Sequence, residues 1–483
     1  MRRLVNREEE VRELRELVGN DRQLALLYGR RRIGKTFLLT HAWENQDRVL
    51  YFTASATSPE INRRALLREA SAWSGEELRE EDYPTWRTVF RAIFELRPTE
   101  PVVVVIDEFQ YLASTEHGLR EVASELNAVR EGTIRRSGGL LLVLSGSAVN
   151  TLKALEAGGS PLFGRLDWRQ RLPPFDYLDA GQMVEGYGPR DRILTYAAFG
   201  GTPKYLDAVD DAHTVADNIV QLLLSPNGRV RIQVETALEQ EEGLREIPKY
   251  RAILTSVGLK RRTVGEIAAS LGQEADWSVK RMVKELVRLE YLTEERNFDA
   301  PRNQAIRYRM ADPAQRFYYG LVLPNESAIA SAGPRTVWEE RLAHETWLSY
   351  VGQQVFEDVV QQAYLRKARV NDLPSVEKWG RWEGQDRNRE SLEIDIVTRL
   401  LAGFMMTGSV KFQTRRADAR VFLDHIHALE RLTASGQGWA REALDPGSPF
   451  LFVSAAGFKD SFREVCEEQG ERPVITWSLD DLL

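Results

Sequence analysis

A phosphate-binding loop stands near the start of the sequence. Residues 29–36 read Gly-Arg-Arg-Arg-Ile-Gly-Lys-Thr, which satisfies the pattern G-x-x-x-x-G-K-[ST]. Glycines let such a loop curl until its N–H groups face a polyphosphate, and the next helix presents its positive end there. Lys35 is expected to reach the β and γ phosphates of ATP, and the Thr36 hydroxyl to hold Mg²⁺. The remaining residues of the predicted cradle are Gly29, Arg30, Arg31, Arg32, Ile33 and Gly34.

The residues around this loop argue against a chance match to a short pattern. An apolar run at residues 24–28 precedes the loop, and a helical pattern at residues 37–43 follows it. Strand, glycine-rich loop and helix in that order are the context in which such a loop binds phosphate. We therefore expect a strand to enter the loop and a helix to leave it.

Two adjacent carboxylates follow a second apolar run. Residues 102–106 are Val-Val-Val-Val-Ile, and Asp107 and Glu108 come next. An uninterrupted apolar run is typical of a parallel strand buried on both faces, and such sheets bind ligands at the carboxyl ends of their strands. Asp107 is expected to support Mg²⁺, and Glu108 to orient and polarise a water for attack on the γ-phosphate. A surface turn with two acids is the alternative, which the buried-strand pattern disfavours.

Two further polar positions are candidates for sensing the γ-phosphate. A third apolar run, residues 140–144, ends in Ser145-Gly146-Ser147. Ser145 or Ser147 would then contact the phosphate, although Ser-Gly-Ser is also ordinary turn chemistry. Arg165 is a candidate arginine finger or sensor, with a plain surface arginine as the alternative.

Five short segments, taken together, point to a known family. They are Asn6-Arg7-Glu8, the loop at 29–36, Ile106-Asp107-Glu108-Phe109-Gln110-Tyr111-Leu112, Leu144-Ser145-Gly146-Ser147 and Gly200-Gly201-Thr202-Pro203-Lys204-Tyr205-Leu206. In this order they resemble the archaeal-type ATPases, which are relatives of the AAA+ and STAND NTPases. The resemblance implies a P-loop core with a helical lid near the nucleotide, then a winged helix. It also implies a C-terminal domain similar to the PD-(D/E)xK nucleases.

Composition limits the class of protein. A chain of 483 residues is too long for one typical core, so about three domains are expected. No apolar run approaches the roughly 20 residues that span a bilayer, and residues 1–10 lack the apolar segment of a secretory signal. The single cysteine, Cys466, excludes an intrachain disulfide and a cysteine-cluster metal site. We therefore expect a cytoplasmic protein with no membrane partner.

The order of predicted elements gives an α/β fold with four parts. Residues 1–175 alternate strand and helix, which favours a P-loop NTPase core with a parallel sheet. Residues 176–245 read as a helical lid, broken at Gly200-Gly201-Thr202-Pro203. Residues 246–325 are predicted to form a winged helix. Residues 331–483 are predicted to form a small α/β domain that resembles a restriction endonuclease.

The winged-helix prediction rests on a pattern of three helices and a hairpin. Residues 250–257 form one apolar-periodic helix, and Thr263 and Glu266 have the spacing of a capping box at the start of a second. Residues 277–292 form the third. The basic residues of the third helix are Lys280, Arg281, Lys284 and Arg288, and those around it are Lys260, Arg261, Arg262, Arg302, Arg307 and Arg309. Such a helix contacts double-stranded DNA, unless the module contacts a protein partner instead. The net charge of −7 limits DNA binding to a local basic face.

The C-terminal domain has part of a nuclease site. Residues 391–397 alternate like a strand that carries Glu393 and Asp395 on one face, and Lys411 lies on the next predicted strand. The nuclease pattern uses carboxylates to hold Mg²⁺ and a lysine to steady the attacking water. Glu357 matches the helix acid that such folds often add. Ser409 stands where a second carboxylate is expected, and serine is a poor Mg²⁺ ligand, so we expect little or no cleavage.

Three readings of the function follow from these sites. The first is an ATP-binding and ATP-hydrolysing switch that couples its nucleotide state to the winged helix and nuclease-like domain, on or near DNA. The second is a DNA- or protein-binding module that ATP or ADP regulates with negligible turnover. The third is a metal-dependent nuclease gated by ATP. Glu108 separates the first two readings, because an ATPase should lose turnover in Glu108→Gln while it still binds nucleotide. Ser409 bears on the third reading, because at this position the sequence departs from a working nuclease site.

Overall fold

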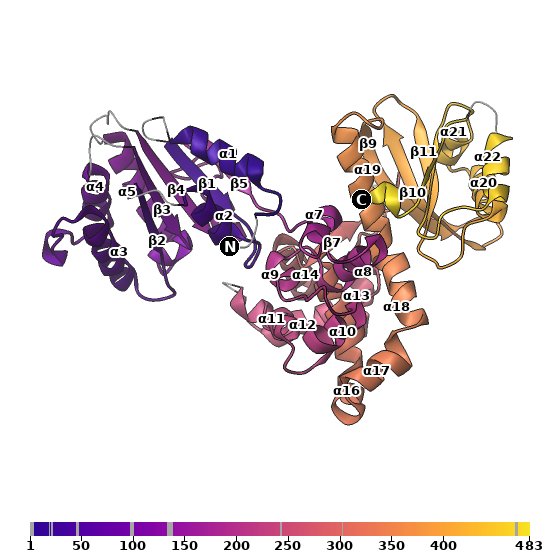
Figure 1. Cartoon of the computed structure of the whole chain (residues 1–483), viewed down its shortest axis with the longest axis horizontal. Coiled ribbons are helices and arrows are strands. Elements are labelled where there is room, and N and C mark those ends of the chain that lie inside the picture. Colours follow the sequence, from indigo (N-terminus) through magenta and orange to yellow (C-terminus); the bar gives the residue numbers. More distant parts are fainter. Residues whose placement is uncertain are drawn as a thin grey trace. The chain divides into compact units, whose positions relative to one another are not determined.

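The computed structural model of the chain divides into two compact units, Met1–Pro174 and Phe175–Leu483 (Figure 1). It describes residues 4–18, 20, 23–44, 48–96, 101–132, 139–241, 244–301, 303–468 and 472–483. Arg302, one of the basic residues expected in the wing, lies outside the described residues. Within the described part of the chain, no helix is both long enough and apolar enough to cross a membrane.

The first unit contains a sheet of five parallel strands. They are β1 (Gln23–Tyr28), β2 (Val49–Thr53), β3 (Val102–Asp107), β4 (Leu140–Gly146) and β5 (Trp168–Arg171). Their order is β2-β3-β4-β1-β5, and each neighbouring pair runs parallel. Every residue of β3 and β4 is buried, as their uninterrupted apolar runs predict. The expected α/β core with a parallel sheet is confirmed.

Helices cover both faces of this sheet. They are α1 (Glu8–Leu17), α2 (Lys35–Ala42), α3 (Pro59–Ser74), α4 (Trp86–Glu95), α5 (Glu116–Gly132) and α6 (Val149–Ala154). Because side chains alternate along a strand, Leu24 and Leu26 of β1 enter one core, with α3, α4 and α5. Ala25 and Leu27 enter the other core, with α1 and α2. Figure 1 shows these two helical layers on either side of the sheet.

The second unit begins with short helices. They are α7 (Tyr177–Gln182), α8 (Pro189–Phe199), α9 (Pro203–Leu206), α10 (Val215–Ile219) and α11 (Arg229–Glu235). The predicted break lies between α8 and α9, where Gly200 adopts φ +65°. A Cβ on Gly201 would lie 1.8 Å from the carbonyl oxygen of Phe175, so only glycine allows this approach. The helical character of the described residues between 175 and 241 agrees with the sequence, whereas the lid role stays a prediction.

Three helices and a three-stranded sheet follow. They are α12 (Ile247–Val257), β6 (Arg262–Thr263), α13 (Val264–Ser270), α14 (Trp277–Arg288), β7 (Leu292–Glu295) and β8 (Arg307–Met310). The antiparallel sheet has the order β6-β8-β7. The capping box is confirmed, because Thr263 Oγ1 accepts from the Glu266 N–H at 3.2 Å and the Glu266 carboxylate accepts from the Thr263 N–H at 2.7 Å. We call the described residues between 247 and 310 the helix–hairpin module.

The rest of the second unit is a helical segment followed by a mixed sheet. The helices are α15 (Pro313–Phe317), α16 (Glu326–Ala332), α17 (Pro334–Val337), α18 (Glu345–Tyr350) and α19 (Glu357–Arg369), with π-helical segments at Tyr318–Val322, Trp338–Leu342 and Val351–Phe356. A further π-helical segment, Val220–Leu224, lies earlier, between α10 and α11. The strands are β9 (Val376–Gln385), β10 (Ser391–Leu400), β11 (Met405–Lys411), β12 (Phe450–Ser454) and β13 (Val474–Trp477).

This C-terminal sheet has the order β13-β12-β11-β10-β9. Strands β9, β10 and β11 pair antiparallel, and β11, β12 and β13 pair parallel. Helices α20 (Ala419–Ala434), α21 (Gly438–Ala443) and α22 (Asp460–Glu467) pack on it through Phe422, Trp439 and Phe462. A small α/β domain was expected here, and the sheet is consistent with that expectation.

Candidate nucleotide site and carboxylate cluster

The predicted phosphate-binding loop connects β1 to α2. A Cβ on Gly29 would lie 2.5 Å from the carbonyl oxygen of Leu172, so glycine is required where the loop leaves β1. Gly34 adopts φ +91° and caps the start of α2. The two glycines therefore allow the turn that the sequence pattern predicts between strand and helix.

Lys35 lies inside this loop with 6% of its surface exposed. Its Nζ donates hydrogen bonds to the carbonyl oxygens of Gly29 at 2.9 Å and Arg30 at 3.0 Å. Burial lowers the pKa of Lys35, and the nearby carboxylates of Glu108 and Asp107 oppose that shift. The ammonium group is thus held by neutral carbonyl partners, which the charged oxygens of a polyphosphate can replace.

The first acid of the predicted pair meets the loop directly. Thr36 donates from Oγ1 to Asp107 Oδ2 at 2.8 Å, and the hydroxyl of Tyr51 on β2 donates to the same oxygen at 2.9 Å. Burial and the neighbouring Asp107 raise the pKa of Tyr51, so it stays a donor. Mg²⁺ takes its oxygen ligands mainly from carboxylates, phosphates and water, and in phosphate-binding loops a Ser or Thr hydroxyl joins them, so Asp107 and Thr36 fit that ion. Tyr51 was not predicted, because its approach depends on the pairing of β2 with β3.

The second acid is held by residues beyond β3 and β4. The Glu108 carboxylate accepts hydrogen bonds from the Ser147 N–H at 3.2 Å, from Ser147 Oγ at 2.8 Å and from the Gln110 side-chain amide. A Cβ on Gly146 would lie 2.2 Å from Gln110 Oε1, so this glycine makes room for the amide. Glu108 itself adopts φ 54°. The carboxylate therefore has a fixed position at the end of β3.

The structure separates the two candidate sensor serines. Ser147 contacts Glu108, and its Oγ lies 3.3 Å from the Nε of Arg31 in the loop. Arg31 also donates to the hydroxyl of Tyr111 at 2.6 Å. Ser145 is fully buried in β4, and its hydroxyl has no hydrogen-bond partner among the described residues. Ser147, and not Ser145, thus links the loop to Glu108.

Among the described residues, the Arg165 side chain contacts one carboxylate and one backbone carbonyl. Its Nε lies 3.6 Å from Glu131, and its Nη1 donates to the carbonyl oxygen of Pro161 at 3.2 Å. The side chain is 45% exposed. A role for Arg165 as an arginine finger stays a prediction.

Comparison with known proteins agrees with this geometry. Residues 4–209 match a family model described as an ATPase domain predominantly from Archaea. The chain contains an archaeal-type ATPase domain. An uncharacterized protein of Methanocaldococcus jannaschii is 25% identical over 383 residues, which cover 78% of this chain and 81% of that protein.

Two solved structures are similar to the chain at a lower level. A Walker-type ATPase of Pyrococcus abyssi gives a TM-score of 0.45 at 21% identity, and the match covers 65% of this chain and 96% of that one. The ORC2 protein of Aeropyrum pernix, in ADPNP–ADP complexes, gives a TM-score of 0.43 at 15% identity. That match covers 68% of this chain and 95% of the ORC2 chain.

Outside the ATPase domain, the basic residues predicted on the third helix lie on an exposed face of α14. Lys280 and Lys284 form no ion pair within the described part of the chain, whereas Arg288 pairs with Glu285 at 2.5 Å. The guanidinium of Arg281 lies 4.9 Å from the ring centre of Trp277, which is 72% exposed. Trp277 was not predicted as a functional residue, because its exposure depends on how α14 packs.

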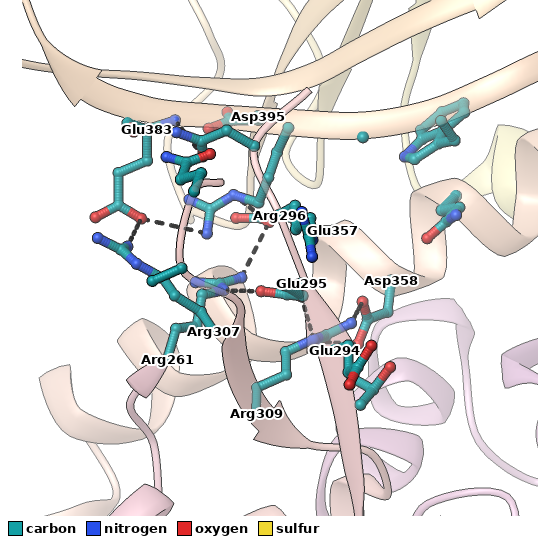
Figure 2. Close-up of a pocket in the computed structure, with 18 residues that line it drawn as sticks. Arg261, Glu294, Glu295, Arg296, Arg307, Arg309, Glu357, Asp358, Glu383 and Asp395 are labelled. Carbon is teal, nitrogen blue, oxygen red and sulfur yellow. Dashed lines mark hydrogen bonds and ion pairs between the residues drawn. The ribbon is translucent and has the colours of Figure 1, made fainter. Parts of the chain in front are cut away.

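Arg309 and Arg316 differ from the exposed cations of α14 because they are largely buried and share one carboxylate. Arg309 donates to both carboxylate oxygens of Asp358, at 2.9 and 2.6 Å, and Arg316 lies 3.4 Å from the same carboxylate. Burial alone would raise the pKa of Asp358, but these two arginines lower it to about 2. Figure 2 shows Arg309 and Asp358 together with Glu295 and Arg261. Arg309 therefore stabilises the contact between β8 and α19 and does not face solvent.

The predicted nuclease-like residues do come together. Glu357, Glu393 and Asp395 each place a carboxylate oxygen within 4.8 Å of the others. Asp395 accepts hydrogen bonds from Ser409 Oγ at 3.0 Å and the Val410 N–H at 2.8 Å, and Lys411 Nζ lies 3.4 Å away. We call Glu357, Glu393 and Asp395 the carboxylate cluster. Its oxygens suit a divalent cation, and Ser409 contributes a hydrogen bond where a further carboxylate was expected.

Arginines already balance the charge of this cluster. Arg381 on β9 pairs with Glu393, and its Nε lies 3.7 Å from Glu357. Arg261 also lies 3.5 Å from Glu357. These contacts mean that a cation entering the cluster must displace arginine side chains. The sequence did not identify Arg381, because only the pairing of β9 with β10 places it beside Glu393.

Burial raises the pKa of Glu357 to about 7, with Asp395 adding to the shift and Arg381 opposing it. The folded protein then keeps a proton between pH 4.5 and 7 that the unfolded chain releases, so stability falls as the pH rises through this window. The wild type should lose free energy of unfolding between pH 5 and pH 8, and we expect Glu357→Gln to reduce that loss by up to roughly 3 kcal/mol. The measurement is denaturant unfolding at pH 5 and pH 8. Glu377→Gln, at an exposed position of β9, is the control. An unchanged pH dependence in Glu357→Gln would contradict the shifted pKa.

Proposed function

We propose that the chain is an ATP-binding and ATP-hydrolysing switch. The observation that carries the proposal is the group of Lys35, Thr36, Asp107 and Glu108 at one edge of the parallel sheet, joined by the hydrogen bonds of Thr36 to Asp107 and of Ser147 to Glu108. The resemblance of residues 4–209 to archaeal ATPase domains supports it. The nucleotide state would be coupled to the helix–hairpin module and the C-terminal sheet, on or near DNA.

Each residue of this group has a separate task in the proposed reaction. Lys35 exchanges its carbonyl partners for the β and γ phosphates, and Thr36 and Asp107 hold Mg²⁺. When bound, Mg²⁺ neutralises charge on the phosphate oxygens. Glu108 accepts a hydrogen bond from the attacking water once one of its present donors gives way. Ser147 is placed to sense the phosphate because it contacts both Arg31 and Glu108.

Two substitutions test this assignment. Lys35→Ala should abolish ATP binding measured by calorimetry, because the phosphates lose their cationic partner. Glu108→Gln should bind ATP as tightly as the wild type and lose turnover by at least roughly 100-fold, because an amide cannot accept the water's proton. Lys153→Ala, at a lysine on α6, is a control that should change neither. Wild-type turnover in Glu108→Gln would favour a binding module over an ATPase.

We further propose that α14 contacts duplex DNA and that the helix–hairpin module acts as a winged helix. The support is the row of exposed cations on α14, of which Lys280 and Lys284 have no ion-pair partner among the described residues. Phosphate contacts by lysine and arginine supply most of the affinity of such helices. A protein partner with an acidic surface is the alternative occupant.

The triple variant Lys280→Ala/Arg281→Ala/Lys284→Ala tests the DNA proposal. It should weaken binding to duplexes of different sequence by about the same factor, roughly 10- to 100-fold at low salt, and flatten the dependence of affinity on salt. Fluorescence anisotropy with two unrelated duplexes measures both effects. If the variant binds duplex as tightly as the wild type, α14 contacts a protein instead.

The carboxylate cluster supports a second, weaker candidate, a nuclease-like domain that binds a divalent cation and cleaves little or not at all. Asp395 and Glu357 would hold the cation with help from Glu393. Ser409 adds no charge, and Arg381 competes for Glu393. Two-metal cleavage needs more oxygen ligands than this cluster offers.

Metal titration and plasmid cleavage test this second candidate. Ser409→Glu should bind Mn²⁺ roughly 10-fold more tightly than the wild type, because it adds a carboxylate next to Asp395. Asp395→Ala should bind less metal than the wild type. Efficient wild-type cleavage that Asp395→Ala abolishes would overturn the inactive assignment. Absence of binding even in Ser409→Glu would make these charges structural.

A further inference from the structure

Two adjoining cavities lie where the helix–hairpin module meets α19 and β9. The inner cavity, of about 360 Å³, is drawn in Figure 2 and reaches Glu357 and Asp395. The outer cavity, of about 490 Å³, is lined by Lys260, Arg261, Arg262, Glu266, Arg307 and Glu383. The cavities share Arg261, Arg307 and Glu383.

The outer cavity has an excess of positive charge. Four of its six lining residues are cations and two are carboxylates. One of the carboxylates is occupied elsewhere, because Glu266 accepts hydrogen bonds from the N–H and the hydroxyl of Thr263 in the capping box. Glu383 is the carboxylate that forms an ion pair with a cation of this cavity, Arg307, and the charge of Glu266 also acts on Arg262 and Arg307.

Three cations of the outer cavity have no ion-pair partner among the described residues or only a weak one, so a ligand can bind them without displacing a strong contact. Lys260 and Arg262 form no ion pair within the described residues, and Arg262 donates only to the backbone oxygen of Glu266 at 3.3 Å. Arg307 lies 3.3 Å from Glu383, but the two side chains are 45% and 43% exposed, and an exposed pair of this kind is weak. Arg261, by contrast, is 14% exposed and bonded to Glu295 at 2.8 Å.

We propose that the outer cavity binds a phosphate group of a single-stranded nucleic acid or a free nucleotide. Lys260, Arg262 and Arg307 supply the cations, and the phosphate takes the place of Glu383 on Arg307. One guanidinium group can donate two parallel hydrogen bonds to two oxygens of a phosphate, and both Arg262 and Arg307 carry such a group. A volume of about 490 Å³ is that of a small-ligand site and matches a nucleotide or a short segment of one strand.

This site belongs to the helix–hairpin module but lies apart from the α14 surface proposed to contact duplex DNA. It shares no residue with the phosphate-binding loop of the ATPase domain or with the exposed cations of α14. It also needs no metal, because its ligand is held by cations. Arg261 and Arg307 line both cavities. A phosphate bound in the outer cavity would therefore lie next to the inner cavity, which reaches Glu357 and Asp395 of the carboxylate cluster.

Fluorescence anisotropy with a 5′-labelled oligothymidine tests the proposal on the full chain without added nucleotide. Lys260→Ala, Arg262→Ala and Arg307→Ala should each weaken binding roughly fivefold, and each should make the salt slope shallower by about 0.7. Glu383→Gln should tighten binding roughly threefold, because the competing charge is removed. This gain cannot come from misfolding. Lys459→Ala, at an exposed lysine beside α22, is the matched control and should bind as the wild type does.

Two further measurements complete the test. Competition by ADP and by inorganic pyrophosphate in the Lys35→Ala background separates the sources: displacement of the oligonucleotide indicates a free nucleotide as a second ligand, and no displacement indicates the strand backbone. Wild-type affinity in all three cation variants, or loss of binding only in the α14 triple variant, would overturn the outer-cavity site. Weaker binding by Glu383→Gln would overturn the exchange at Arg307.

Discussion

The ATPase domain depends on the parallel register of its three central strands. Tyr28 of β1 pairs with Gly146 of β4, and Ile106 of β3 pairs with Leu144. Since these strands run in one direction, the loop after β1, the acids after β3 and the serine after β4 come to the same edge of the sheet. A shift of one residue would turn each buried side chain of a strand to the opposite face, so the core fixes the site.

Hydrogen bonds hold the charged side chains of the site in place before any nucleotide or metal binds. Buried charged groups are costly without partners, and here Lys35 is held by loop carbonyls, Asp107 by Thr36 and Tyr51, and Glu108 by Ser147 and Gln110. Nucleotide and metal would exchange these contacts for stronger ones. The charged groups are thus already close to the positions that the proposed reaction requires, which lowers the cost of ordering them.

The second unit uses its cations in two ways. Arg309 and Arg316 are buried against Asp358, and such pairs fix the contact between β8 and α19 because breaking one would leave a charge buried and unpaired. Lys260 and Lys284 are exposed and have no ion-pair partner within the described residues. Only cations of the second kind can exchange water for phosphate at low cost. Basic residues that look equivalent in the sequence therefore differ in what they can bind.

The sequence alone determined the features that depend on local chemistry. The phosphate-binding loop, the buried strand before Asp107, the capping box of Thr263 and Glu266 and most helix and strand positions follow from residue types at short spacing. The end of one helix was predicted too late: the helix predicted at residues 277–292 ends at Arg288, and Leu292 begins β7.

Only the tertiary structure decided which side chains meet across long stretches of chain. It placed Ser147 against Glu108, Arg309 against Asp358 and Arg381 between Glu357 and Glu393. These partners are between 12 and 49 residues apart in the sequence, and the pairing of a charged side chain depends on burial and on neighbours from other elements. A local pattern carries no information about either, so the availability of each cation and carboxylate emerged only once the chain was folded.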